Sequence, residues 1–225
     1  MPRKNIKLLT GKPLIAYTIE TALRSKIFDR VIFSTEDEEI AKIAKKFGAE
    51  IPFMRPERLA KGKVSRWDVF QYVTKHLEET ENYIPDIVVD LSPTSPLRAV
   101  EDIRACLRKL IREKADIVTT VCEADRNPYF NMIELRNGKV SIVKKPRKKI
   151  TQGQDAPKVY SVNDSINAIR RDALLKNDSV LSNKNIKFVV MPKERSIDID
   201  DEFDFKVAEC ILKSKLNLKK SYAKE

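Results

Sequence analysis

Two aspartates near the end of the chain have the spacing of a divalent-metal site. Asp198 and Asp200 alternate with isoleucines at the two-residue period of a β-strand, so both carboxylates should share one face, about 7 Å apart. Like charges at this spacing repel each other unless a cation lies near them, and carboxylate oxygens suit Mg²⁺. One interpretation is therefore a magnesium site. In the other, one of the two is solvated and Asp201 caps the helix that follows, and both interpretations remain open.

A second polar group follows an apolar strand pattern, in residues 91–98 (LSPTSPLR). It offers the hydroxyl groups of Ser92, Thr94 and Ser95, two prolines that fix the backbone, and the planar cation of Arg98. Such a corner can bind an anion, because ligands of open α/β sheets bind beyond the carboxyl ends of the strands. The alternative is a rigid strand-to-helix turn in which the hydroxyl groups cap the next helix.

The elements that must position these groups alternate along the chain. Apolar residues with helical spacing predict helices at residues 15–27, 37–47, 67–77, 101–113 and 202–216. Short apolar runs predict strands at residues 31–34, 87–91, 117–122, 133–135, 140–143, 159–162 and 186–191. This alternation predicts an α/β fold, with a mostly parallel sheet covered by helices on both faces. The denser strands and an Asn137-Gly138 hairpin turn predict a β-rich segment, about residues 125–170, inserted in a single domain of residues 1–225.

Composition narrows the class of protein. The 225 residues are 42% apolar and 34% charged, which is typical of a globular protein with a large core. No apolar run has the length of a membrane span or a signal peptide, so we expect no membrane partner and a cytoplasmic location. Three widely spaced cysteines predict reduced thiols, and the single histidine, His76, gives no basis for a histidine-rich metal site.

The net charge of +11 is concentrated in residues 144–149 (KKPRKK) and in the tail from Lys213 onward. A positive field of this kind favours anionic partners. Aromatic residues do not alternate with the basic ones, and no helix-turn-helix, zinc-finger or RNA-binding signature is visible. Solvated basic loops are one interpretation of this charge, and a phosphate-bearing ligand such as a nucleotide is the main functional one. We expect no nucleic acid.

With these groups in view, the chain resembles the acylneuraminate cytidylyltransferase family, which comprises the CMP-N-acetylneuraminic acid synthetases and the enzymes that activate related acidic sugars. The motifs that carry the resemblance, in the family's order, are PRKNIKLLTGKPLIAYTI, FDRVIFSTEDEEIAKIAKKFGAE, RPERLA, LSPTSPLR, NPYFNMIE, PKVYSVNDSI and SIDIDDEFDF. They span almost the whole length of the chain. Together they are far more specific than any one of them alone.

The resemblance implies a Rossmann-like three-layer nucleotidyltransferase fold, in which the inserted β-rich segment mediates a homodimer and reaches the sugar pocket of the partner. It also implies transfer of CMP from CTP to an acidic 2-keto sugar, with release of pyrophosphate. That sugar would be sialic acid or a legionaminic or pseudaminic relative. CTP and the sugar would be the small-molecule partners, and Mg²⁺ would be the cofactor.

The functional residues of the family map onto matching positions here. Asp198 and Asp200 would hold Mg²⁺ and, with Lys4, would be the catalytic residues. Lys4 and Asn5 stand at the end of the family's phosphate loop and, with Arg55 on the cytosine side, would bind the nucleotide. The residues implied for the sugar side are Ser92, Thr94, Ser95, Arg98, Tyr160 and Asn163.

The chain departs from the family's pattern at its start and in its pocket. The family's first strand and its loop of the form Ala-Arg-x-Gly-Ser-Lys-Gly should precede Pro2, where only Met1 stands. An active enzyme with a start further upstream, and a truncated or diverged relative that binds nucleotide or sugar without catalysis, both remain open. Five other positions also differ. The family usually has serine at Arg66, glutamine at Ser92, arginine at Gly153, glycine at Asp164 and tyrosine at Asn167.

Overall fold

The computed structural model describes residues 1, 3–60, 64–146 and 148–222, the stretch 216–222 as backbone only, and a four-stranded sheet lies at its centre. The strands of this sheet, in spatial order, are β3 (Ile87–Leu91), β7 (Tyr160–Arg170), β4 (Ile117–Glu123) and β8 (Ile186–Val190). β7 pairs antiparallel with both of its neighbours, whereas β4 and β8 are parallel. β3, β4 and β8 therefore run in one direction, as expected for a mostly parallel α/β sheet, and β7 runs against them.

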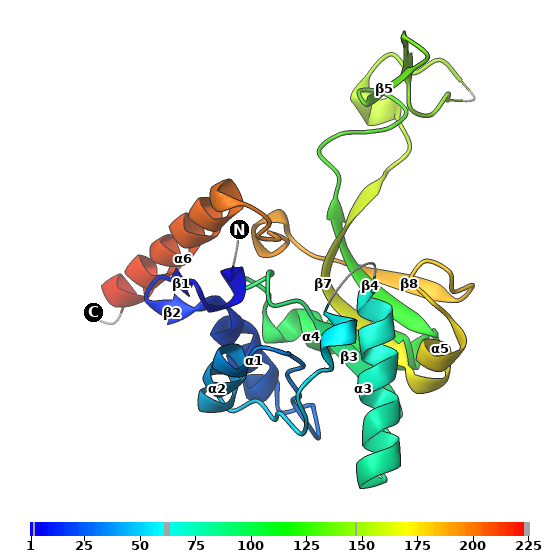
Figure 1. Ribbon diagram of the computed structural model, residues 1–225. Helices are drawn as coiled ribbons and strands as arrows, with labels where there is room; N and C mark the ends of the chain where they lie inside the picture. The colour runs from blue at the N-terminus through cyan, green and yellow to red at the C-terminus, as the bar shows by residue number, and fades with distance from the viewer. Residues whose placement is uncertain (2, 61–63, 147, 223–225) are drawn as a thin grey trace.

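Helices cover both faces of this sheet (Figure 1). One face carries α4 (Val100–Arg112), and the other carries α3 (Arg66–Glu81) and α5 (Arg171–Lys176). Successive side chains of β4 point to opposite faces, so Val118 packs in the buried cluster beneath α4 and Ile117 packs in the cluster beneath α3 and α5. The predicted three-layer α/β architecture is confirmed.

Other helices and short strands come from the two ends of the chain and from the connections. They are η1 (Lys4–Ile6), β1 (Leu8–Leu9), β2 (Lys12–Pro13), α1 (Leu14–Ser25), α2 (Glu38–Lys46), η2 (Glu57–Leu59), η3 (Gly153–Asp155), η4 (Lys193–Arg195) and α6 (Glu202–Tyr222). One buried cluster joins the two ends, because Leu9 and Leu97 pack with Ile199 and with Phe205 of α6. This cluster holds the loop after β3 against the segment that precedes α6.

A long arm, residues 124–159, projects from one end of the central sheet (Figure 1). Its hairpin joins β5 (Ile133–Arg136) to β6 (Lys139–Ile142) through the predicted Asn137-Gly138 turn. The two turn residues have φ angles of 51° and 74°, and positive values at both central positions are what a type I′ turn requires. Of the predicted basic run in this arm, Arg147 lies outside the described residues.

Two predicted strands differ from the observed ones. The strand expected at residues 31–34 is reduced to a single parallel bridge between Ile32 and Glu50. Among the described residues, the segment makes no other β-ladder contact. The strand expected at residues 159–162 continues to Arg170 as part of the central sheet and not of the inserted arm. Polar residues in its middle interrupt the apolar alternation, and buried polar partners on β4 satisfy them.

β7 contains a bulge at Asp164, one of the positions where the chain departs from its resemblance. The register of β7 against β4 shifts between Thr119 and Val121, and Asp164 has a φ of 47°. A glycine adopts this left-handed conformation without a Cβ penalty. The glycine that the family usually has here therefore fits a demand of the backbone.

Asp164→Gly is expected to raise the free energy of unfolding by about 0.5–1 kcal/mol, because it relieves the left-handed strain at an exposed position. Urea titration followed by circular dichroism measures this change. Asp178→Gly is the matched control, because Asp178 is also exposed but lacks a positive φ, and this variant should be neutral or destabilised. A destabilised Asp164→Gly protein would contradict the explanation.

Candidate active site

Two segments that follow parallel strands meet at the carboxyl end of the sheet. The loop of residues 92–98 follows β3, and residues 191–201 follow β8. They are joined by a backbone hydrogen bond of 2.9 Å, in which the amide of Ile199 donates to the carbonyl oxygen of Thr94. Ligands of α/β sheets bind beyond these strand ends, so the location agrees with a binding site.

Lys4 crosses from the N-terminal turn to this junction. Its Nζ donates to the carbonyl oxygen of Ile199 at 2.9 Å and forms an ion pair with Asp200 Oδ1 at 3.2 Å. The Asp200 side chain is 78% exposed. Asp198, by contrast, has a buried Oδ1 without a hydrogen-bond partner among the described residues. We call Lys4, Thr94, Asp198 and Asp200 the carboxylate cluster.

The strand predicted around the two aspartates is wrong, although the alternation of side chains is right. Residues 196–200 form no β-ladder, because their backbone meets the loop after β3 instead of another strand. The isoleucines on either side of Asp198 still pack in the cluster with Phe205, which leaves the carboxylates outside it. Asp201 caps α6, since its Oδ1 accepts hydrogen bonds of 2.8 and 3.0 Å from the backbone of that helix. The cap belongs to the second of the two interpretations of this segment, and the structure shows it.

The segment that carries Asp198 is held from two sides. Arg195 forms a two-point ion pair with Asp102 of α4, with both N–O distances at 2.9 Å. Asn163 Nδ2 donates to Ser196 Oγ at 2.9 Å, and its own Oδ1 accepts from Thr120 at 2.6 Å. Asn163 was predicted on the sugar side, but it is buried and engaged at both ends of its amide. It positions the segment from within the sheet.

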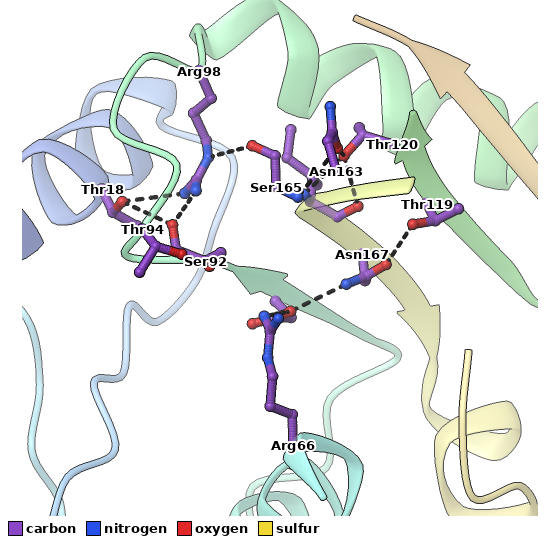
Figure 2. Close-up of polar contacts among 12 residues, drawn as sticks. Thr18, Arg66, Ser92, Thr94, Arg98, Thr119, Thr120, Asn163, Ser165 and Asn167 are labelled. Atoms are coloured by element: carbon purple, nitrogen blue, oxygen red, sulfur yellow. Dashed lines mark hydrogen bonds and ion pairs between the residues drawn. The ribbon is translucent and has the colours of Figure 1, made fainter. Parts of the chain in front are cut away.

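The prediction that Arg98 lines the sugar side is wrong, because its guanidinium lies in the interior (Figure 2). The Nε donates to Ser165 Oγ at 3.1 Å, the Nη1 to Thr18 Oγ1 at 3.3 Å, and the Nη2 to the carbonyl oxygen of Ser92. Burial lowers the pKa of Arg98 to about 10, so it remains charged at neutral pH. Its role is to brace the loop. Ser95, which is fully buried, does not line a pocket either.

The other predicted residues are spread more widely. Ser92 is buried and its hydroxyl lies 2.8 Å from that of Thr94. Tyr160 lies at the base of the arm, with its ring centroid 5.0 Å from that of Phe188. Arg55 pairs with Glu36, and no hydrogen bond between described residues joins it to the carboxylate cluster. The structure therefore brings together only part of the predicted site.

Asn5 lies in the η1 turn next to Lys4, and its role on the nucleotide side stays a prediction. Gly153, where the family usually has arginine, lies in the arm beside Phe130. A Cβ at Gly153 would meet the ring of Phe130 at 3.3 Å, so a larger residue there would require that ring to move.

One polar group was missed as a site, and it centres on Asp90 of β3. Arg66 Nη2 lies 2.6 Å from Asp90 Oδ2, and Asn167 Nδ2 donates to the same oxygen at 3.2 Å (Figure 2). The signal in the sequence was a charged residue inside the apolar strand IVVDL. Burial raises the pKa of Asp90, and Arg66 opposes this shift. Because the net shift is upward, the stability that depends on Asp90 is greatest at low pH and declines as the pH rises through its folded-state value.

The fold and the site define the class of protein. A three-layer α/β sheet whose strand-end loops gather a lysine, hydroxyl groups and two carboxylates has the form of an enzyme that handles phosphate-bearing ligands. Residues 1–209 match the family model described as cytidylyltransferase, and the chain belongs to that cytidylyltransferase family. The resemblance noted from the motifs is thereby confirmed.

The chain is also similar to individual proteins along nearly its whole length. It is 39% identical to the post-translational flagellin modification protein B of Campylobacter coli, over 94% of this chain and 89% of that one. It is 37% identical to the CMP-N,N'-diacetyllegionaminic acid synthase of Campylobacter jejuni, with the same coverage. The solved structure of CMP:2-keto-3-deoxy-manno-octonic acid synthetase complexed with CTP shares the fold, with a TM-score of 0.69 at 16% identity over 96% of this chain and 93% of that one.

Among the described residues, no helix has both the length and the apolar character needed to cross a membrane.

Proposed function

We propose that this chain transfers CMP from CTP to an acidic 2-keto sugar of the sialic, legionaminic or pseudaminic type and releases pyrophosphate. Relatives with 37% and 32% identity are named as a CMP-N,N'-diacetyllegionaminic acid synthase and a pseudaminic acid cytidylyltransferase, which supports this substrate class. The observation that carries the proposal is the carboxylate cluster at the carboxyl end of the sheet, where Lys4 meets Asp200.

The proposed reaction is a displacement at phosphorus. The oxygen of the sugar's anomeric hydroxyl forms a bond to the α-phosphorus of CTP and gives up its proton to solvent. The bond from that phosphorus to the bridging oxygen breaks, and pyrophosphate leaves with the electron pair of that bond. Such transfers depend mainly on positioning and on neutralising charge. The ammonium group of Lys4 supplies positive charge, and the half-buried hydroxyl of Thr94 offers a hydrogen bond to an anionic substrate.

Mg²⁺ is the proposed cofactor, and Asp198 and Asp200 are the residues that would hold it. The buried and unpartnered Oδ1 of Asp198 supports this assignment, because a desolvated carboxylate oxygen needs a cation or a donor. No group of three or more acidic, histidine or cysteine residues that could bind a metal occurs among the described residues. Phosphate oxygens and water would complete the coordination, as is usual for Mg²⁺. When bound, the ion would neutralise phosphate charge and acidify the attacking hydroxyl.

A homodimer formed through the arm is part of the proposal. The side chains of Ile133, Leu135 and Val140 are 70%, 71% and 65% exposed, and they lie on one face of the hairpin because Leu135 pairs directly with Val140. An exposed apolar face of this kind indicates a protein–protein contact. The cytoplasmic location remains a prediction from the sequence.

The experiment mixes the purified protein with CTP, Mg²⁺ and each of the three acidic sugars, and measures pyrophosphate release together with the CMP-sugar product. Asp200→Ala is expected to lower the rate by at least about 10²-fold, because one ligand of the cation is lost. Asp178→Ala is the matched control, since Asp178 is exposed and remote in sequence from the cluster.

A protein that binds CTP in calorimetry but forms no product with any acidic sugar would contradict the proposed activity. That result would favour the alternative of a non-catalytic relative, for which the departures at Ser92 and Asn167 are the motivation.

A further inference from the structure

We infer that Arg66, fixed on the buried carboxylate of Asp90, is a substrate-recognition residue whose remaining N–H groups bind an acceptor oxygen of one of the two substrates. The inference rests on the proposed function, because it concerns the same end of the sheet. It assigns a role to the pair of Arg66 and Asp90, which has no role in the motifs or in the proposed reaction.

A continuous chain of polar contacts leads to Arg66 from the middle of the sheet (Figure 2). Thr119 Oγ1 of β4 donates to Asn167 Oδ1 of β7 at 2.7 Å, and Asn167 Nδ2 donates to Asp90 Oδ2 of β3 at 3.2 Å. Arg66, at the start of α3, then pairs with the same Asp90 oxygen at 2.6 Å. This series of polar contacts therefore crosses three adjacent strands before it reaches a helix.

The exposure of the side chains rises along this series of contacts, from Thr119 to Arg66. Thr119 and Asn167 are buried, and the Asp90 side chain is 9% exposed, whereas the Arg66 side chain is 50% exposed. The buried members fix the carboxylate, and the carboxylate fixes one nitrogen of the guanidinium. The result is a half-exposed arginine whose position is set from the interior, which is the arrangement expected for a binding group held ready by its supporting contacts.

A structural ion pair alone does not explain this arrangement well. A buried carboxylate is costly unless it is paired, and an apolar residue at Asp90 would suit the strand IVVDL without that cost. Only Nη2 of Arg66 is hydrogen-bonded within the described residues, so Nε and Nη1 remain available. The ring of Phe70 lies 5.9 Å from the guanidinium carbon. A guanidinium with free donors matches carboxylate, phosphate and carbonyl oxygens.

The group lies on the side of the sheet where the carboxylate cluster is. Asp90 stands one residue before the end of β3, and the loop that contains Thr94 begins directly after that strand. The buried Arg98 feels the negative charges of both Asp90 and Asp198. CTP and an acidic sugar both carry anionic and carbonyl oxygens, so the chemistry of recognition is the same for either, and the experiment must distinguish between them.

The test measures the KM of CTP and the KM of the acidic sugar separately for the wild type, Arg66→Ser and Arg66→Lys. Arg66→Ser is expected to raise one KM by at least about 10-fold, the effect of losing a charge-assisted hydrogen bond, and to leave the other within about 2-fold. Arg66→Lys should recover part of the loss. Arg112→Ser is the matched control, because its side chain is 78% exposed on α4, and both KM values should remain unchanged. The KM that changes identifies the substrate.

A purely structural role makes a different prediction. Arg66→Ser leaves the buried Asp90 without its ion-pair partner and should lower the melting temperature. A second change, Asp90→Asn, removes that buried charge. If the Arg66→Ser/Asp90→Asn protein recovers both its melting temperature and its KM, the inference is overturned. If it recovers the melting temperature while the KM stays high, the inference is supported.

Calorimetry separates this inference from the proposed function. A wild type without turnover would contradict the proposed activity, but CTP and the sugars can still be titrated into the wild type and Arg66→Ser. A weaker affinity of Arg66→Ser for one of these ligands supports the recognition role. Unchanged affinities for CTP and for every sugar, or no binding of any of them to the wild type, would overturn it.

Discussion

Asp198→Asn should lower the rate of CMP-sugar formation by at least about 10³-fold at saturating substrates, the largest effect that we expect from a single change. The substitution keeps the shape of the side chain but removes its negative charge. Oδ1 of Asp198 is buried and has no hydrogen-bond partner among the described residues. This oxygen is therefore available to a bound cation, and loss of the negative charge should affect catalysis far more than stability.

The measurement is initial-rate kinetics over a range of Mg²⁺ concentrations, with thermal unfolding recorded in parallel. Asp178→Asn makes the same chemical change at an exposed position and should retain the wild-type rate. A higher Mg²⁺ requirement in Asp198→Asn would identify the aspartate as a metal ligand. An Asp198→Asn enzyme with a normal rate would remove the basis for the proposed metal site.

The second large effect is expected in the arm. Replacing both Ile133 and Leu135 with aspartate should weaken the proposed dimer by at least about 10³-fold in Kd, because charged groups would be buried without partners in an apolar contact. The two side chains are 70% and 71% exposed, so the fold of the chain itself should tolerate the change. Size-exclusion chromatography with light scattering at micromolar concentrations measures the mass in solution.

Ser141→Asp provides the control for this experiment. Ser141 pairs with Glu134 on the opposite face of the same hairpin, so an aspartate there adds charge without entering the apolar face. This variant should remain a dimer. A wild type that is monomeric, or a double variant that still dimerises, would show that the arm has another use.

Much of the fold could be predicted because local signals and final structure agree. β3 has the predicted bounds, since a short apolar run between polar segments is typical of a strand. Asp37 caps α2, because its Oδ1 accepts backbone hydrogen bonds of 2.8 and 3.0 Å. An aspartate directly before a helical pattern is typical of such a cap. The Asn137-Gly138 turn formed because both residues tolerate a positive φ.

The errors in the predicted site have a common cause. The residues concerned form hydrogen bonds and ion pairs with residues that are distant in the sequence. Arg98 was assigned to a ligand because its planar cation stands beside the hydroxyl groups after a strand and matches the family's motif, but Thr18 and Ser165 satisfy its donors from other parts of the chain. Asp90 was passed over because its partners, Arg66 and Asn167, are 24 and 77 residues away. Periodicity shows which face a residue occupies but not which distant group will meet it there.

The place of β7 in the sheet sets the order in which the protein can fold. β7 lies between β3 and β4, yet it is made after both of them and after the whole arm. On the ribosome, the two earlier strands therefore emerge with the gap between them unfilled. Pairing between segments so far apart in the chain is slow. Until β7 inserts, the edges of β3 and β4 are open to other chains, and the nascent protein is most prone to aggregation in that interval.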